Sequence, residues 1–321
     1  MVFCLFHGEI LRMVNVMNSI DKKSMVYRMM GVFLIMAATV LWGSSFAVRK
    51  AAMTDIGPLM FNAMRFFAAF VFMLIVFFVR RMFVGVDKQV NTAVGKQIKA
   101  GIIIGMLYGV GSVFQQLGLN LVSAGETGFV TSLYSVMVPV LARILFKTKI
   151  RPVVWVAVAF SGIGLYFVTG GGVAANSGML ILLAGSFCFA LQIIAIAKFI
   201  EANDALLLVI VQLGIGVLVN LAMAAIAAEP FEINMAYEAA APILYTGIMS
   251  LGVANFCQFA GQSRVSPTVA AIICSFESVF GLLFGIILLD EKMTGMKLAG
   301  CVFILAAVLL SQIKGKNKGM E

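Results

Sequence analysis

The sequence has 321 residues, of which 62% are hydrophobic and 12% are charged, and its mean hydropathy is +1.07. Soluble proteins contain about 45–50% apolar and about 25% charged residues, so this composition excludes a soluble fold. A helix needs about 20 residues to cross the hydrocarbon core of a bilayer, and ten such spans would use most of the chain. We therefore expect an all-α polytopic membrane protein without a soluble domain.

Groups suited to catalysis are scarce. The single histidine, His7, precedes the first apolar stretch, so a nucleophile inside the membrane has no histidine base beside it. The sequence has no CxxC pair to hold zinc and no Walker motif to bind a nucleotide. We therefore expect no catalytic residue, no metal and no cofactor, and a membrane-embedded enzyme is the least favoured class of function.

Ten apolar stretches are long enough to form helical spans. Prolines support this division, because Pro58, Pro152, Pro242 and Pro267 stand at expected helix starts, where a missing N–H costs little. Only Pro139 falls inside a span, which predicts a kink in the fourth helix. In chain order the expected spans are 29–49, 58–79, 98–117, 123–146, 152–169, 177–198, 204–225, 240–260, 267–289 and 295–313.

The net charge of +9 indicates an orientation in the membrane rather than a nucleic-acid partner. If both termini are cytoplasmic, most of the 23 lysines and arginines fall in cytoplasmic segments, as the positive-inside rule requires. Arg49, Lys50, Lys292 and Lys297 then fall on the outer side. The expected outer loop at 226–239 agrees with this orientation, because it carries glutamates and no cation.

An internal repeat divides the chain into two halves. Residues 105–149 match residues 248–292 without a gap at 13 of 45 positions. The match pairs the third, fourth and start of the fifth expected spans with the eighth, ninth and start of the tenth. The earlier spans align more weakly at a different offset, which pairs Trp42 with Phe189 and Arg65 with Gln212. A repeat unit of five helices has an odd number of crossings, so the second copy would lie upside down relative to the first.

Three segments resemble a known family. They are LWGSSFAVRKAAMTDIGPLMFNAMRFFAAFVFML (41–74), SAGETGFVTSLYSVMVPVLARIL (123–145) and SPTVAAIICSFESVFGLLFGIILLDEKMTGMKLAGCVFILAAVLL (266–310). They are similar to the EamA-type branch of the drug/metabolite transporter superfamily. The resemblance implies ten transmembrane helices in two inverted five-helix repeats, a plasma-membrane location, and transport, often export, of small metabolites or amino acids.

The expected organisation follows from the repeat and the resemblance together. One departure concerns the ninth helix, where the family commonly has a proline after the acidic residue and this chain has Ser278 after Glu277, which lowers the expectation of a break. The expected segments are a cytoplasmic extension at 1–28, the first five-helix repeat at 29–170, the second at 175–313 and a cytoplasmic basic tail at 314–321.

Glu277 is the acidic residue expected at the centre of a span. It lies ten residues after Pro267, about 15 Å along a helix and therefore near the membrane midplane. A charge there costs about 2.5–3.5 kcal/mol on insertion scales, so it needs a partner, a proton or a water-filled cavity. The functional interpretations are contact with a substrate amine or proton coupling, and the alternative is a protonated or paired structural carboxyl.

Arg65 and two glutamines are the next candidates for a binding site. Arg65 either lines a cavity, where its fork suits a carboxylate, or extends to the membrane surface. Gln115 and Gln258 occupy equivalent positions in the repeat, which favours a polar site at the midplane, although bonding between helices explains them nearly as well.

Other polar and aromatic residues of the spans complete the candidate lining, and packing is an equally good explanation for each of them. Tyr134 aligns with Glu277 in the repeat. The remaining candidates are Trp42, Ser45, Tyr108, Ser112, Gln192, Gln212 and Asn255.

Some conspicuous residues have structural explanations. Ser123 followed by Glu126 forms a capping-box pattern at the outer start of the fourth helix. The acidic cluster at 290–291 fits an anchor at the membrane interface. Gly101, Gly105 and Gly109 share one helix face and allow close packing.

The leading interpretation is a secondary transporter, favoured as an exporter, that moves small metabolites or amino-acid-like solutes by alternating access. A channel or a non-transporting scaffold is the alternative. The expected partners are the lipid bilayer, a small-molecule substrate and, as one option, a coupling proton. The oligomeric state, the substrate and the direction are not specified by the sequence.

The orientation can be tested by cysteine labelling. In a cysteine-free background, a cysteine at Lys88, in the expected cytoplasmic loop at 80–97, should be protected from an impermeant maleimide in intact cells. A cysteine in the 226–239 loop serves as the control and should react. Labelling of position 88 from outside would overturn the assignment.

Overall fold

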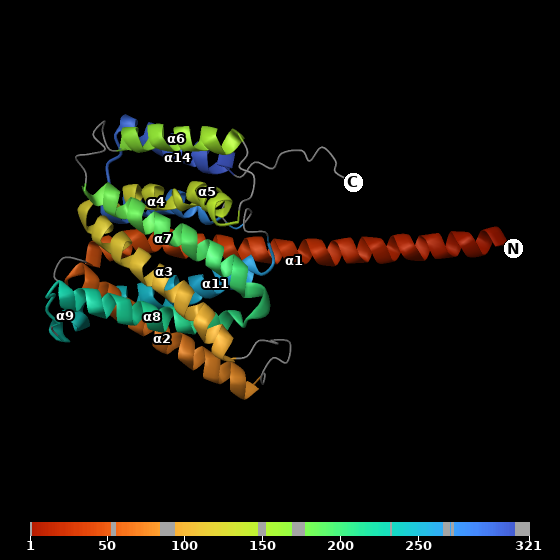
Figure 1. Cartoon of the computed structure of the whole chain (residues 1–321), viewed down its shortest axis with the longest axis horizontal. Coiled ribbons are helices and arrows are strands. Elements are labelled where there is room, and N and C mark those ends of the chain that lie inside the picture. Colours follow the sequence, from red (N-terminus) through yellow and green to blue (C-terminus); the bar gives the residue numbers. More distant parts are fainter. Residues whose placement is uncertain are drawn as a thin grey trace.

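The structure is a computed structural model that describes residues 2–52, 56–83, 94–146, 152–168, 177–231, 233–265, 270 and 273–311. All the regular elements in these segments are helices (Figure 1). They are α1 Val2–Ala52, α2 Pro58–Phe83, α3 Val94–Leu121, α4 Ala124–Ser132, α5 Tyr134–Phe146, α6 Pro152–Val168, α7 Ser177–Phe199, η2 Ile200–Ala202, α8 Ala205–Ile226, α9 Ile233–Glu238, α10 Ala240–Leu244, the π-helix η3 Tyr245–Val253, α11 Ala254–Gln262, α13 Glu277–Leu289 and α14 Gly295–Ser311.

The helices follow the expected spans in order, and seven of them are long and apolar enough to cross a membrane. These seven are Met25–Ala52, Pro58–Phe83, Val94–Leu121, Ala124–Leu145, Ser177–Ala202, Ala205–Ile226 and Ala240–Gln262. Three shorter apolar helices, Trp155–Gly164, Glu277–Leu289 and Gly295–Leu310, lie in the other expected spans. Helix α1 also runs back to Val2 through the segment expected to be a cytoplasmic extension.

The bundle is organised around α3, which packs against α7 and α8. Helix α1 packs against α11 and α13, and α2 packs against α8 and η3. Helices α6 and α14 pair with each other at one edge of the molecule (Figure 1).

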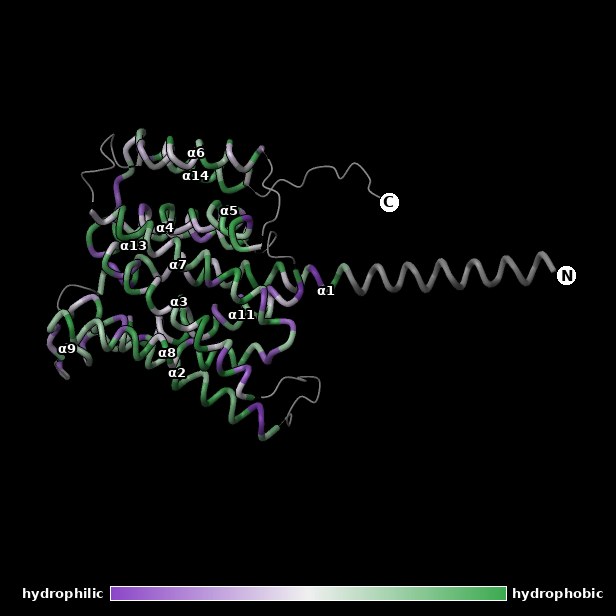
Figure 2. Tube along the Cα trace, viewed as in Figure 1, coloured by the Kyte–Doolittle hydropathy of each residue, from purple (hydrophilic) through white to green (hydrophobic). Residues whose placement is uncertain are grey.

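The outer surface of the bundle is apolar. Most described helical residues are hydrophobic (Figure 2), and large side chains such as Phe67, Phe78 and Ile287 are more than half exposed. A soluble monomer rarely exposes apolar patches of this extent, whereas a bilayer solvates them. The surface therefore agrees with the composition: the chain is a multi-pass membrane protein.

The fourth and ninth expected spans are both interrupted at equivalent positions. Helix α4 ends before Leu133, whose N–H bonds to the Val130 carbonyl at 3.2 Å, and α5 begins at Tyr134. A turn at 275–276 precedes α13, which begins at Glu277. The 143-residue offset of the repeat relates position 133 to position 276, so the two breaks coincide.

The position of each break corrects an expectation. Pro139 lies inside α5, and the interruption falls at Leu133 instead. The carbonyl that the Pro139 ring crowds, that of Ser135, lies inside α5 and after the break, so the proline does not set the position of the break. The break before Glu277 needs no proline, so the lowered expectation of a break there was wrong.

The expected eighth span contains a π-helix. Within Tyr245–Val253 the backbone bonds run from residue i to i−5, and this continues at Ala254, whose N–H bonds to the Met249 carbonyl. Where such a segment returns to α-helical bonding, a carbonyl is left for a side-chain donor. The N–H of the Trp42 indole bonds to the Ser250 carbonyl at 3.0 Å, which ties α1 to η3.

Glycines allow close approach between helices. The expected small-residue face at Gly101, Gly105 and Gly109 lies against α8, where a Cβ at Gly101 would stand 2.6 Å from Val211 Cβ. At Gly43 on α1, a Cβ would stand 2.4 Å from Phe280 Cβ and 2.8 Å from Gly281 N of α13.

Glutamates cap helices at the end of the bundle where α2 and α4 begin. The expected capping box is confirmed, because Ser123 and Glu126 bond to each other's backbone N–H. Glu126 also pairs with Lys297 at 2.6 Å. Glu291, which the sequence suggested as an interface anchor, accepts bonds from the N–H groups of Ala124 and Gly125 at the start of α4. These contacts join α4 to the distant 291–297 region.

Some expectations fall outside the described residues. They concern the helix start at 266–267, the centre of the 80–97 loop and the tail at 314–321.

The close contact at Gly43 predicts a specific loss of stability. Gly43→Ala should lower the free energy of unfolding by about 1–3 kcal/mol, because Phe280 and the α13 backbone have to move apart. Gly162→Ala on α6 is the matched control, since a Cβ there meets nothing within 4 Å. Thermal unfolding in detergent should show a lowered midpoint for the first variant only, and equal midpoints would contradict the packing.

Candidate functional site

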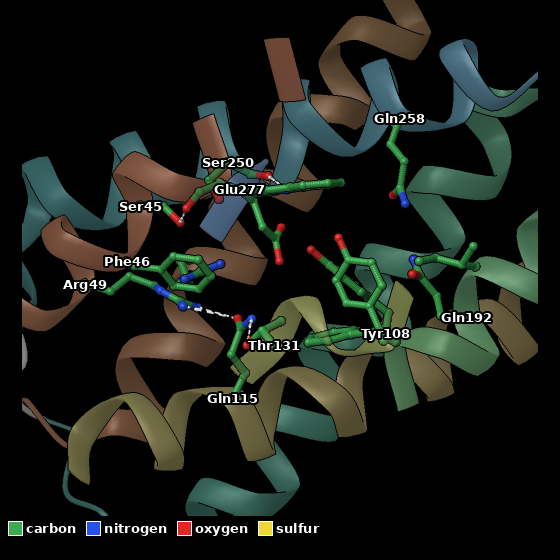
Figure 3. Close-up of a pocket in the computed structure, with 15 residues that line it drawn as sticks. Ser45, Phe46, Arg49, Tyr108, Gln115, Thr131, Gln192, Ser250, Gln258 and Glu277 are labelled. Carbon is green, nitrogen blue, oxygen red and sulfur yellow. Dashed lines mark hydrogen bonds between the residues drawn. The ribbon is translucent and has the colours of Figure 1, made fainter. Parts of the chain in front are cut away.

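A small cavity of about 50 Å³ lies in the middle of the bundle, between α1, α2, α3, α7 and α13 (Figure 3). The structure brings most of the sequence-predicted candidates together here: Trp42, Ser45, Arg65, Tyr108, Gln115, Tyr134, Gln192, Gln258 and Glu277. The lining residues that were not predicted are Phe46, Arg49, Thr131, Phe189, Ile193 and Ser250.

Glu277 projects into the cavity from the first position of α13. Its carboxylate points into the space between Arg49 and Tyr108 (Figure 3), and its Oε1 has no hydrogen-bond partner in the described part of the chain. The break at 275–276 and the close contact of α13 with Gly43 fix the backbone that carries it. The side chain is 5% exposed, so the carboxyl is buried, and both its functional role and the alternative of a protonated or paired structural carboxyl stay predictions.

Arg49 belongs to this cavity and not to an outer loop, which corrects the assignment made from charge. Helix α1 continues to Ala52, so Arg49 lies within it and is 1% exposed. Its guanidinium donates two bonds of 3.1 Å to Gln115 Oε1 and lies 5.1 Å from the centre of the Phe46 ring. Gln115 in turn donates to Thr131 at 3.4 Å.

Arg65 is 3% exposed, so it lines the cavity and does not extend to the membrane surface. Its Nε and Nη1 atoms have no hydrogen-bond partner among the described residues. Gly247 of η3 packs directly against the backbone of α2 at Arg65, because a Cβ at Gly247 would stand 2.6 Å from the Arg65 carbonyl oxygen. Buried guanidinium donors without partners have the chemistry to bind an anionic group.

The repeat explains why Arg65 has open donors. Its counterpart, Gln212, is bonded to the amides of Gln192 and Asn255. The residues that align with those two amides in the first half are Ser45 and Ser112, whose short hydroxyls bond to the carbonyls of Trp42 and Gly109. In the first half, serines that bond to their own helix therefore stand where the second half has long amide side chains, and they leave the Arg65 donors without partners in the described part of the chain.

Three predicted residues lie behind the cavity wall and do not line it. Gln212 and Asn255 form the amide chain just described. Ser112 accepts bonds from Asn62 and Asn220 at 3.3 Å, where α2, α3 and α8 meet. All three are buried, and these bonds agree with the packing interpretation.

The unpredicted lining has partly recognisable signals. Arg49 was missed because it stands at the end of the expected first span and was counted on the outer side, whereas the helix continues to Ala52. Ser250 contributes through its backbone carbonyl, which the π-helix leaves free to bond to Trp42. No residue type in the sequence predicts a π-helix. Phe46, Phe189 and Ile193 are residue types that are common in any apolar core, so nothing in the sequence marked them as site residues.

The cavity combines ionisable groups with an apolar surface. The carboxyl of Glu277 and the guanidinium groups of Arg49 and Arg65 lie among aromatic and aliphatic side chains, which include Phe46, Phe189 and Ile193. The described residues contain no group of three or more metal-ligating side chains. The arrangement suits reversible binding of a small charged or zwitterionic molecule.

Comparison with known proteins identifies the family. The model of the EamA-like transporter family matches the chain twice, at residues 29–170 and 176–312. The chain belongs to the EamA-like transporter family. It is therefore a membrane transporter by family.

Relatives and solved structures agree with this membership. The chain is 29% identical over 291 residues to an uncharacterized transporter of Archaeoglobus fulgidus, which covers 90% of this chain and 87% of the relative. It is 22% identical to the uncharacterized transporter YoaV of Bacillus subtilis, over 86% of this chain and 94% of that protein. A crystal structure with 19% identity covers 87% of this chain and 95% of its own with a TM-score of 0.60, which supports the fold alone.

The open donors of Arg65 predict a stabilising substitution. Arg65→Met should leave the unfolding midpoint unchanged or raise it, because it removes buried donors that have no partner. Asn255→Leu is the contrast and should cost about 1–3 kcal/mol, because it leaves buried partners unsatisfied. Thermal unfolding in detergent measures both, and an equal loss in the two variants would contradict the open state of Arg65.

Proposed function

We propose that this transporter is a secondary transporter that exports small amino-acid-like solutes across the plasma membrane by alternating access. The observation that carries the proposal is the set of buried atoms of ionisable side chains that have no partner among the described residues and meet in one cavity: Glu277 Oε1, Arg49 Nε, and the Nε and Nη1 atoms of Arg65. Uncompensated charges in a membrane domain are costly, so their presence favours a bound solute that supplies the partners.

The chemistry of the cavity suggests how such a solute binds. The fork of Arg65 suits a carboxylate, and Glu277 suits an ammonium group. Phe46, Phe189 and Ile193 offer an apolar surface to the rest of the molecule. A zwitterion satisfies both signs of charge at once, which a simple anion or cation does not.

The helix contacts support two inverted five-helix repeats and ten spans. Under that arrangement α1 corresponds to α7, α2 to α8 and α3 to the helix that contains η3 and α11. The contact of α3 with α7 then has its counterpart in that of α11 with α1. The contact of α3 with α8 has its counterpart in that of η3 with α2. Such paired contacts are typical of transporters in which two halves rock about a central site.

The orientation proposed is with both termini in the cytoplasm. Moving Arg49 into the cavity removes one cation from the outer side and so strengthens the charge asymmetry. The glutamate caps at the start of α4 and the pair between Glu126 and Lys297 would then close the outer end of the bundle.

Glu277→Gln tests the roles proposed for the carboxylate. The variant keeps the volume and the hydrogen-bonding capacity of the side chain and removes its charge. If Glu277 couples protons, gradient-driven flux should be lost while exchange persists. If it binds the ammonium group, affinity for zwitterions should fall at every pH. Proteoliposomes with an internal pH dye and radiolabelled L-leucine and L-asparagine measure both quantities.

The control for this experiment is Glu201→Gln, which changes an exposed glutamate outside the cavity and should transport normally. Gradient-driven transport by Glu277→Gln with unchanged apparent affinity would reject both roles. Loss of folded protein would favour a structural role, and a saturable, stereoselective flux in the parent protein separates a transporter from a channel or a scaffold.

A further inference from the structure

A chain of four side chains begins and ends at the cavity wall. Gln192 Nε2 donates to Gln212 Oε1 at 3.0 Å, and Gln212 Nε2 donates to Asn255 Oδ1 at 3.1 Å. Asn255 Nδ2 then donates to the Tyr108 hydroxyl at 2.9 Å. Gln192 and Tyr108 line the cavity, whereas Gln212 and Asn255 are buried behind them (Figure 3 shows the two that line it).

A backbone carbonyl fixes the direction of this chain. Asn255 Nδ2 also donates to the Leu251 carbonyl at 2.8 Å. If the amide were turned over, its oxygen would face that carbonyl at the same distance, and two acceptors would repel each other. Asn255 Oδ1 must therefore face Gln212, which must donate to it, so Gln212 accepts from Gln192.

The direction determines what the cavity presents. Gln192 donates its amide N–H to Gln212, so its side-chain carbonyl oxygen remains available as an acceptor in the cavity. Tyr108 accepts a bond from Asn255, so its own O–H proton is available as a donor, and the described residues include no acceptor for it. The Tyr108 ring is held between Phe66 and Phe189, with ring centres 5.7 and 5.8 Å away, so the hydroxyl has a fixed position.

We propose that Gln212 and Asn255 are positioning residues that orient Gln192 and Tyr108 in one wall of the site. This wall then binds an uncharged polar group through an acceptor on Gln192 and a donor on Tyr108. The group that matches both is a primary carboxamide, whose N–H₂ donates to Gln192 and whose oxygen accepts from Tyr108. This inference rests on the proposed solute-binding role of the cavity and adds a preference for the neutral part of the solute.

The polarity of the wall also identifies what it disfavours. An isosteric apolar group would leave the Gln192 oxygen and the Tyr108 proton without partners in a desolvated place, which costs far more than the bond itself contributes. The wall formed by Gln192 and Tyr108 therefore selects the neutral end of the solute, while Arg65 offers donors to its carboxylate.

Matched ligand pairs test the proposal. L-Asparagine and L-leucine have side chains of similar shape, one a carboxamide and one apolar. Cyclohexanecarboxamide and cyclohexyl methyl ketone differ only by an N–H₂ in place of a methyl group and carry no charge, so they do not need Arg65 or Glu277. Isothermal titration of the purified full-length protein gives the ratio of dissociation constants within each pair.

The parent protein should bind the carboxamide of each pair roughly tenfold more tightly. In Gln212→Met the amide of Gln192 is free to turn, and the ratio should fall below about threefold. Tyr108→Phe removes only a hydroxyl and should reduce the ratio for asparagine and leucine, because leucine has no side-chain oxygen to accept from that hydroxyl. This keeps the test open if Gln212→Met does not fold. Asn220→Leu is the control, because Asn220 is a buried, bonded amide on the same helix whose contacts, Asn62, Ser112 and Gly216, lie outside the cavity.

A purely structural role for Gln212 would weaken both members of a pair equally and leave the ratio unchanged, which would overturn the proposal. Equal affinities within both pairs in the parent protein, or no binding of any probe, would also overturn it. If only the uncharged pair binds and is discriminated, the wall is as proposed and the amino-acid-like substrate is wrong. If amino acids bind without discrimination, the proposed function stands and this inference fails.

Discussion

Hydrocarbon offers no hydrogen bonds, so each polar side chain buried in this bundle has to find a partner in the protein or in something that the protein carries. Most of them have one: amides bond to amides behind the cavity, and Asn62, Ser112 and Asn220 bond to one another where three helices meet. In the described part of the chain, unpartnered atoms also occur on the buried Gln262 and Asn62, but the cavity is where three ionisable side chains with such atoms meet: Arg49, Arg65 and Glu277.

The two halves of the chain differ in how their buried polar side chains find hydrogen-bond partners, although their sequences align. In the second half, Gln212 lies between two long amides and is fully bonded. In the first half, the aligned arginine faces two serines that bond to their own helix, so its charge stays open. Under the proposed repeat arrangement, a symmetric scaffold would thus support an asymmetric site. Divergence at a few pairs of positions is sufficient, because helix packing depends mainly on other residues, such as the glycines that face α8.

The sequence predicted the helices and most of the cavity lining, because apolar length and the cost of a buried charge are properties of the residues themselves. It placed Arg49 outside, because the end of a helix is set by packing as much as by composition, and α1 continues to Ala52. The break before Glu277 and the π-helix at Tyr245–Val253 were not predicted. Both depend on how a helix lies against its neighbours, which no local pattern of residue types specifies.

The bond from the Trp42 indole to the Ser250 carbonyl gives the molecule an optical property. The chain has two tryptophans, and Trp155 lies exposed on the distant α6. Replacing Trp155 by phenylalanine leaves a single fluorophore in the wall of the cavity, attached to α1 and bonded to η3. Indole emission responds to hydration and to hydrogen bonding, so separation of these two helices would change its wavelength. The protein therefore carries a built-in sensor of movement at its own centre, without an attached dye.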